Sequence, residues 1–564
     1  MRLIELSANK PDFKAIRFNR TGLTVIRGSN RYSEEYEGSG NGVGKSLALG
    51  LVHHCLGANA QSVIKEKLSD WVFSLRFELN GIEHCVERSG DGNHLVLDGV
   101  KQKNLAEYKN WLDNSGVFNF AKNEALLSFR ALIKRFTRYA KEDCLDPLKT
   151  NKEDEAPALL RTCFLLGLAY DTVQQKIDHK KRLDALNKAV KYWKEEPILH
   201  EVFQAGHEPQ LRFQQLEREI PRLETDLKQF DVAENYHDLL AEANAKTDEI
   251  RRLEKEISTL QFQLEGIEKL LRQHPDISRN DLLGLYEGLQ AIFKPDILVH
   301  FEKVEGFQKS FLANRMKRLE TDKSQLSRAV IQKEDARKAI AQLRDDLLKN
   351  LQGKRALDEY VAISNQLASF KAEREKLHEY LTFNDKRQEQ IQTVKEVMLH
   401  EDAVATTYVR ENPHSEYNIF FQILAGKLYP KLNSGIVLDS NTGNNSVRYA
   451  LKVQIEGDNS DGIGAAKVLC FDWIVLTQGK NHTVDFLWHD NRLFAHMGAN
   501  PRAAWFKEVI DSNMDKQYIA TINTENHESM KDFLDESHQQ TLDNAVVLDL
   551  YDDDVKNKLL GIQF

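Results

Sequence analysis

Apolar residues recur at alternating intervals of three and four over much of the middle of the chain. Between about residues 165 and 400, glycine and proline are scarce and charged residues are frequent. This heptad spacing is typical of a coiled coil, because it places one apolar seam along each helix. Four runs carry the pattern: Leu216, Ile220, Leu223, Leu227 and Phe230; Ile250, Leu253, Ile257, Leu260, Leu264, Ile267 and Leu271; Leu326, Ala329, Lys333, Ala336, Ile340, Leu343 and Leu347; and, after a phase shift that indicates a stutter, Ile363, Leu367, Phe370, Leu377 and Leu381.

The pattern stops where "RQHPDISRND" and "FKPDILVH" occur, between about residues 272 and 298. We therefore expect an outgoing arm at 165–271, an apex at 272–305 and a returning arm at 306–400. An arm of roughly 100 helical residues would reach on the order of 150 Å. A globular helical bundle is the alternative, but its core helices would not keep this strict spacing for so long.

The flanking segments, residues 1–164 and 401–564, have the patterns of mixed α/β structure. The first contains the strand-like run "GLTVIRG" and hairpin turn signals at Asn80-Gly81 and Asp98-Gly99. The second contains a predicted hairpin, "SGIVLDSNTGNNSVRYALKVQIEG", and the apolar runs "TVDFLWHD", "QYIATIN" and "NAVVLDL". Because the arms fold back, we expect the two segments to meet and form one split domain. Two unrelated domains are the alternative.

Composition narrows the class of protein. The 564 residues carry a net charge of −9, so any contact with nucleic acid would need a local basic patch. Five scattered cysteines without a CxxC motif indicate reduced thiols. No apolar stretch is long enough for a membrane span and the first residues do not form a signal peptide, so we expect a cytoplasmic protein that does not contact membranes.

A glycine-rich segment carries the strongest chemical signal. "SGNGVGKS" follows the strand-like run "GLTVIRG" and opens the predicted helix "KSLALGLVHHCLG". Backbone N–H groups in such a loop surround phosphate oxygens; Lys45 would neutralise the β- and γ-phosphates of ATP, and the Ser46 hydroxyl would ligate Mg²⁺. Ser39 stands where this loop normally starts with glycine. The predicted cofactor-binding residues are Asn41, Gly42, Val43, Gly44, Lys45 and Ser46.

A phosphate loop requires an acidic partner for Mg²⁺, and Asp490 at the end of "TVDFLWHD" fits this role, which makes Ser46 and Asp490 the predicted metal ligands. Many ATPases follow this aspartate with a glutamate that orients and deprotonates the attacking water, but Asn491 stands here. An amide can position water but cannot accept its proton at pH 7. We therefore predict slow hydrolysis with Asn491 at the catalytic position. His489 could supply the base in place of a glutamate. The alternative interpretation is that His489 is a structural histidine at the end of the strand.

A second turn favourable to anions precedes an apolar helix in "NSDGIGAAKVLCFDWIVL". Ser460 and Gly462 lie where a helix N-terminus would present free N–H groups. An ordinary N-cap, made by Ser460 or Asp461, is the alternative interpretation.

The order of these features resembles the SMC/RecN/RecF-like branch of the ABC ATPases. It is most similar to the SMC-like family of bacterial three-component ABC systems, to which Lamassu-type defence ATPases are related. The segments that carry the similarity are "NGVGKSLALGLVHHCLG", "LLSFRALIKRF" with "DPL", "LLGLAY", "FQKSFLANR", "SDGIGAAKVLCFD", "FLWHDNRLF" and "QYIATINTE".

The resemblance implies an α/β ABC-type ATPase head split by a long antiparallel coiled-coil hairpin. It implies a homodimer through the heads, in which each head binds ATP and Mg²⁺. Ser460 and Gly462 of one head would then face the γ-phosphate of the ATP that the other head binds. It also implies a small middle subunit, an effector that is often a nuclease, and a role in sensing phage or plasmid DNA. A RecN/RecF-like DNA repair ATPase and a coiled-coil scaffold with a vestigial nucleotide site are the alternatives.

Several positions depart from the family pattern. Besides Asn491, Asn523 stands where ABC proteins often carry a switch histidine, and "AHMGANP" lacks the aspartate of a D-loop. The segment Ser128-Phe129-Arg130 lies near the place of the Q-loop but has no glutamine. The predicted apex has no CxxC motif, which excludes a zinc hook. These departures affect the expected rate of hydrolysis more than ATP binding.

Double-stranded DNA would have to contact local basic residues. Lys134, Arg138 and Lys141 would share one face of a helix and could track a phosphate backbone. A second group consists of Arg315, Lys317 and Arg318. An ordinary solvated helix face is the alternative for both.

Overall fold

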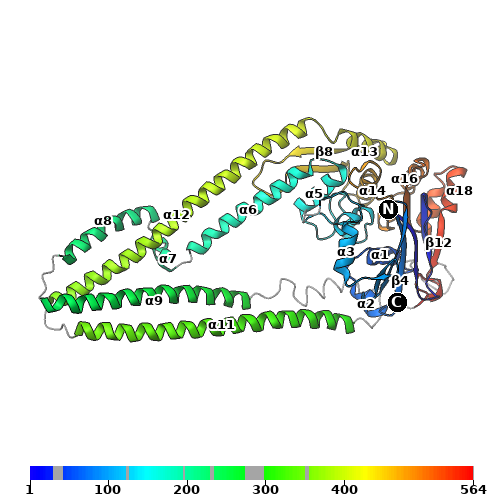
Figure 1. The fold of residues 1–564 in the computed structure, drawn as a ribbon. Helices are drawn as coiled ribbons and strands as arrows, with labels where there is room; N and C mark the ends of the chain where they lie inside the picture. Colours follow the sequence, from blue (N-terminus) through cyan, green and yellow to red (C-terminus); the bar gives the residue numbers. More distant parts are fainter. Residues whose placement is uncertain are drawn as a thin grey trace. The chain divides into compact units, whose positions relative to one another are not determined.

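The computed structural model describes residues 1–29, 42–121, 126–194, 197–206, 208–228, 234–272, 298–349 and 355–562 (Figure 1). The chain forms two compact units. The larger contains Met1–Lys180 and Val397–Phe564, and the smaller contains Lys181–Leu282 and Lys303–Glu396. The larger unit therefore joins the two flanking α/β segments, and the smaller one is built from the heptad region.

Six strands of the larger unit form an antiparallel sheet in the order β2-β1-β4-β5-β6-β7. Both predicted turns are confirmed, because Asn80-Gly81 joins β4 to β5 and Asp98-Gly99 joins β6 to β7. All four turn residues have φ between 50° and 79°, which is the backbone that a type I′ turn requires. The strands are β1 (Arg2–Ala8), β2 (Ile16–Arg17), β4 (Val72–Leu79), β5 (Ile82–Ser89), β6 (Leu95–Leu97) and β7 (Val100–Lys101).

A second, parallel sheet unites the two ends of the chain. Its order is β10-β11-β3-β12, so β3 (Gly22–Ser29) lies between β11 (Gln517–Asn523) and β12 (Val546–Tyr551). Strand β10 (Phe486–His489) pairs in parallel with β11. The prediction of one split domain is confirmed by this pairing. The predicted hairpin is also present, as β8 (Ser434–Ser440) and β9 (Tyr449–Ile455).

Helix α1 (Lys45–Cys55) packs against strands of both sheets, and every residue from Leu47 to Cys55 is buried. The chain leaves it through Leu56 and then Gly57, which has φ 81°. The other helices of this unit are α2 (Ser62–Lys67), α3 (Leu105–Asp113), α4 (Phe129–Leu132), α5 (Glu155–Leu166), α13 (Ser415–Leu428), α14 (Asp461–Gln478), α15 (Arg492–Ala495), α16 (Ala499–Asp511), α17 (Thr524–Lys531) and α18 (Glu536–Asn544).

The described part of the heptad region consists of helices, most of them long. They are α6 (Tyr170–Lys194), α7 (Pro197–Gln204), α8 (Pro209–Lys228), α9 (Glu234–Arg272), α11 (Leu298–Lys349) and α12 (Arg355–Arg410). Helix α8 packs on α12, where Arg212 forms two hydrogen bonds with Glu373 at 2.7 and 2.8 Å. Helix α9 packs on α11, where Lys323 pairs with Glu268 at 2.7 Å. The residues between α9 and α11, which contain most of the predicted apex, lie outside the described part of the chain.

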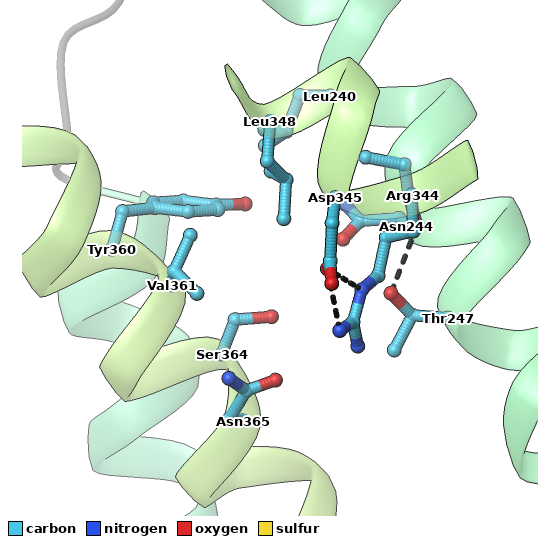
Figure 2. A pocket seen from close by; sticks show the side chains of 11 residues that line it. Leu240, Asn244, Thr247, Arg344, Asp345, Leu348, Tyr360, Val361, Ser364 and Asn365 are labelled. Carbon is cyan, nitrogen blue, oxygen red and sulfur yellow. Dashed lines mark hydrogen bonds and ion pairs between the residues drawn. The ribbon is translucent and has the colours of Figure 1, made fainter. Parts of the chain in front are cut away.

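The arm is not one straight hairpin. Glu375 of α12 lies next to α8, since the neighbouring His378 stacks on Phe213. Lys255 of α9 nevertheless pairs with Glu375 at 3.7 Å, which a straight hairpin would place far away. Helices α9, α11 and α12 also surround a common cavity of about 80 Å³, with Thr247, Asp345 and Ser364 among its lining residues (Figure 2). The pair α9–α11 thus lies against the first part of α12.

In the part of the chain that the structure describes, none of the helices has both the length and the apolar character needed to cross a membrane.

Candidate nucleotide-binding site

The segment between β3 and α1 holds the predicted phosphate loop. Asn41 and Ser39 lie outside the described residues. Gly42 and Gly44 have φ of 79° and 108°, a backbone region that favours glycine. A Cβ at Gly44 would also lie 2.5 Å from Cβ of Leu559. The backbone N–H of Leu559 donates to the carbonyl of Val43 at 3.0 Å, a contact from the far end of the sequence that no motif indicated.

Lys45 begins α1 and is only 7% exposed. Its side chain lies over the end of β3, where a Cβ at Gly28 would come within 2.2 Å of Nζ. Burial lowers the pKa of Lys45 to about 8, although Asp490 and Asp552 oppose the shift. The ammonium group is therefore mostly charged at pH 7 and has lost much of its hydration, so an anion that entered the site would bind it strongly.

Asp490 follows β10 and is 2% exposed. The Ser46 hydroxyl donates to its two carboxylate oxygens, at 3.1 Å to Oδ1 and 3.2 Å to Oδ2. Thr521 of β11 donates a further hydrogen bond to Oδ1 at 2.9 Å. Two residues 444 positions apart thus meet at the carboxyl end of the parallel sheet, as their predicted roles require. Thr521 was not predicted; its place near the end of an apolar strand beside β10 is the signal that could have indicated it.

Asn491 follows Asp490, and its side-chain oxygen accepts a hydrogen bond from the backbone N–H of Asn523 at 2.9 Å. The two positions where the family pattern expects a catalytic glutamate and a switch histidine therefore contact each other. Because the Asn491 oxygen already accepts this bond, only its second lone pair and the side-chain NH₂ group remain to bind a water molecule.

His489 is completely buried in a hydrogen-bonded chain. Trp505 Nε1–H donates to the Tyr518 hydroxyl at 2.7 Å, and this hydroxyl lies 2.8 Å from His489 Nδ1. With Tyr518 donating to Nδ1, His489 Nε2–H donates to Asp472 Oδ2 at 3.2 Å. Burial lowers the pKa of His489, so the ring is neutral and both of its nitrogens are engaged. The interpretation as a structural histidine is confirmed, and the role as alternative base is wrong.

The predicted basic helix face is also wrong. Helix α4 ends at Leu132 and a 3₁₀ turn follows at Ile133–Phe136, so Lys134, Arg138 and Lys141 do not share a helix. Arg138 is completely buried. It forms parallel hydrogen bonds with Asp472 of α14 and donates to the carbonyls of Asp146 at 3.0 Å and Pro147 at 2.7 Å. Its charge is compensated inside the protein and cannot reach a phosphate backbone. In the second basic group, Lys317 and Arg318 are exposed on α11.

Replacing Arg138 with methionine should destabilise the larger unit, because Asp472 would remain as a buried charge without its partner. The expected loss is about 3–5 kcal/mol in the free energy of unfolding, measured by chemical denaturation. The matched control is Lys10→Ala, which breaks the exposed ion pair with Asp70 at 2.6 Å and should cost at most about 1 kcal/mol. Equal losses in the two variants would contradict the structural role of Arg138.

The predicted signature turn lies at the start of α14. Ser460 is the exposed N-cap residue of this helix, and its side chain makes no capping hydrogen bond. Gly462 is buried, and a Cβ there would lie 2.6 Å from the carbonyl oxygen of His496. Among the described residues, no hydrogen bond or ion pair joins Ser460 to Lys45, Ser46 or Asp490. Ser460 and Gly462 therefore make no polar contact with the predicted phosphate and metal ligands in the part of the chain that the structure describes.

Arg130, near the expected Q-loop, is half-buried in the larger unit. It donates to the carbonyl of Leu56 and lies 3.1 Å from His53 Nδ1, and burial lowers its pKa to about 10. The Ser128 side chain caps α4 by accepting from Ala131 N–H. Both side chains have structural contacts that account for their positions.

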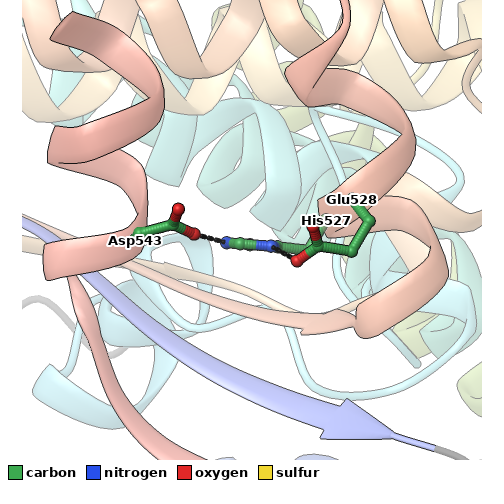
Figure 3. Close-up of side chains that lie close together, drawn as sticks. All are labelled: His527, Glu528 and Asp543. Atoms are coloured by element: carbon green, nitrogen blue, oxygen red, sulfur yellow. Dashed lines mark hydrogen bonds and ion pairs between the residues drawn. The ribbon is translucent and has the colours of Figure 1, made fainter. Parts of the chain in front are cut away.

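One further cluster has the composition of a metal site. His527, Glu528 and Asp543 bring possible ligand atoms within 4.8 Å of one another (Figure 3). However, Lys531 Nζ pairs with Glu528 at 2.9 Å and with Asp543 at 2.7 Å, and Arg27 also pairs with Glu528. These cations already neutralise the carboxylates, so the cluster is accounted for as an ion-pair network.

Residues 424–564 match a domain family described as an uncharacterised protein conserved in bacteria (DUF2326). This segment contains α14, β10, β11 and β12, and therefore Ser460, Gly462, Asp490 and Asn491. A search among curated proteins gives no match.

Among solved structures, the chain is similar to the Smc head domain of Pyrococcus yayanosii with a coiled coil and joint, at 16% identity and a TM-score of 0.36, covering 96% of this chain and 99% of that one. The Smc head domain of Pyrococcus furiosus with an extended coiled coil, bound to the C-terminal domain of ScpA, matches at 12% identity and a TM-score of 0.34, covering 95% and 92%. An SmcHead bound to the C-winged helix domain of ScpA matches at 9% identity and a TM-score of 0.35, covering 94% and 91%. TM-scores this low do not establish a shared fold by themselves.

Proposed function

We propose that this protein is an SMC-like ATP-binding subunit whose heads dimerise on ATP, and which binds DNA and controls a partner effector in defence against foreign DNA. The observation that carries the nucleotide site is the contact between Ser46 and Asp490 beside the buried Lys45. A hydroxyl, a carboxylate and a lysine at the end of a parallel sheet, at the start of a helix, are the groups that hold Mg²⁺ and nucleotide phosphates in phosphate-loop proteins.

Each residue has a distinct role in this proposal. The N–H groups at the start of α1 and the Lys45 ammonium bind the phosphates, and Ser46 and Asp490 hold Mg²⁺. Bound Mg²⁺ supplies charge that neutralises the phosphate oxygens. Thr521 keeps the Asp490 carboxylate oriented through its 2.9 Å hydrogen bond. Ser460 and Gly462 from a second copy would complete the site at the γ-phosphate.

Hydrolysis by this site would be slow. Neither Asn491 nor the buried His489 can accept a proton from water, since the first is an amide and the second has both nitrogens engaged. ATP would then act chiefly as a ligand that holds two heads together, and hydrolysis would release them slowly.

The DNA contact is proposed at basic residues on the surface of the protein. Arg138 is buried, so the basic group to which it belongs does not form the expected DNA-binding face. Lys317 and Arg318 are exposed on α11 and are the residues that we propose for DNA contact. A small middle subunit and an effector nuclease follow from the resemblance of the sequence motifs to three-component ABC systems.

Mass photometry with and without ATP and linear double-stranded DNA tests the proposal directly. A dimer that forms only when ATP and Mg²⁺ are present is expected, with a further shift in mass when DNA is added. Ser460→Arg should prevent the ATP-dependent dimer while leaving ATP binding by the single head intact, because Ser460 is exposed and its side chain makes no capping hydrogen bond. A dimer that persists equally without nucleotide would favour the scaffold function instead.

A further inference from the structure

Arg492 lies at the candidate site and has no role in the proposal so far. It is the first residue of α15, and its side chain is 46% exposed. Its Nε lies 3.6 Å from Asp490 Oδ2, the same oxygen that accepts a hydrogen bond from Ser46 at 3.2 Å. Arg492 and the predicted metal ligand Ser46 therefore share one oxygen of the Asp490 carboxylate.

The charge of Arg492 is compensated by the carboxylate of Asp490. Among the described residues, Asp490 is the only acid within ion-pair distance of its guanidinium. The preceding residue is the neutral Asn491, where a glutamate would have offered a second anionic partner. The surrounding groups Tyr139 and Cys144 feel the positive charge of Arg492 but are half-buried and uncharged, since desolvation raises the pKa of both.

We propose that Arg492 is a catalytic residue that contacts the phosphoryl group transferred to water, acting from the same head as Lys45. This inference rests on the nucleotide site proposed above. The geometry that carries it is the shared contact of Arg492 and Ser46 with Asp490 Oδ2, together with the half-exposed position of the Arg492 side chain.

The electrostatics of the site explain why Arg492 would change partner. If Ser46 and Asp490 held Mg²⁺, the Asp490 carboxylate would be shared with the metal, and its ion pair with Arg492 would weaken. The guanidinium fork matches the oxygens of a phosphate. An arginine supplied from the same chain can stabilise the charge on the equatorial oxygens in the transition state.

The reaction is ordinary hydrolysis of the terminal phosphate. The water oxygen forms a bond to the γ-phosphorus, and the bond from this phosphorus to the β–γ bridging oxygen breaks, with its electron pair remaining on ADP. One proton of the water passes to an oxygen of the released phosphate. Arg492 takes no proton and stabilises charge only, which suits a site that lacks a general base.

Single-turnover hydrolysis and nucleotide binding by Arg492→Ala and Arg492→Lys test the assignment. The alanine variant should bind ATP with an affinity within about threefold of wild type but lose about 100-fold or more in single-turnover rate and in affinity for ADP with aluminium fluoride. The lysine variant should recover only part of the loss, because it lacks the guanidinium fork. Arg17→Ala, at an exposed arginine paired with Glu5 at 3.0 Å, is the matched control and should leave both values unchanged.

Two results would overturn the inference. An alanine variant with wild-type turnover and wild-type affinity for the fluoride complex would show that Arg492 does not contact the reacting group. Tighter Mg²⁺ binding with an unchanged or higher rate would show that Arg492 only shields Asp490. Either result leaves the proposed function intact, provided that wild-type protein binds ATP and Lys45→Ala does not. A wild-type protein that does not bind ATP would instead remove the function itself.

Discussion

Replacing Lys45 with alanine is expected to weaken ATP binding by about 10- to 100-fold. The ammonium group is buried, and the phosphate oxygens of ATP would replace the hydration that it has lost. A charge-assisted interaction of this kind contributes about 1.5–3 kcal/mol, and each 1.4 kcal/mol is about tenfold in affinity. Isothermal titration calorimetry with ATP and Mg²⁺ measures the change.

Lys101→Ala is the control for the loss of one positive charge, because Lys101 lies on β7 in the same unit and is exposed. It should bind ATP as wild type does. Circular dichroism and thermal melting should show that both variants remain folded. Unchanged ATP affinity in the Lys45 variant would remove the assignment of the nucleotide site.

Replacing Asn491 with glutamate should raise ATP turnover by about 100-fold. A carboxylate at this position can accept the proton of the attacking water, and a well-placed general base contributes about 10²–10⁴-fold. The glutamate could also accept the hydrogen bond that Asn523 N–H now donates to Asn491 at 2.9 Å. Phosphate release under saturating ATP, measured at low protein concentration, gives the rate.

Asn491→Gln distinguishes the effect of a proton-accepting carboxylate from the effect of a longer side chain. Glutamine has the size of glutamate but cannot take a proton at pH 7. Its turnover should stay close to wild type. Equal rates in the two variants would contradict the role assigned to position 491. A wild-type turnover of about 10 s⁻¹, the median for enzymes, would equally contradict slow hydrolysis.

The parts of the candidate site that follow local rules could be predicted from the sequence. A strand, a glycine-rich turn and a helix start fix where Lys45 and Ser46 must lie, and parallel strands present their carboxyl ends at one edge, where Asp490 was expected. The hairpins at Asn80-Gly81 and Asp98-Gly99 are of the same kind, because their backbone conformation depends on the turn residues themselves.

What could not be predicted depends on contacts between distant segments. Arg138 occurs in a basic stretch that is typical of a surface, and only Asp472, 334 residues later, makes it a buried residue. The return of α9 along α12 is equally hidden, since a heptad seam indicates that a helix has a partner but not which one. Thr521 gained its role from a strand pairing that the sequence pattern does not specify.

The pairing of β3 has a consequence for how the protein is made. Both neighbours of this strand, β11 and β12, belong to the other end of the chain. At about 5–20 residues per second, the ribosome needs roughly 25–100 s after β3 to complete β11. During that interval the apolar strand β3 lacks both of its sheet neighbours. A truncated product that stops within the coil would therefore expose an unpaired strand edge, so premature termination should yield aggregation-prone or rapidly degraded fragments rather than a half-formed nucleotide site.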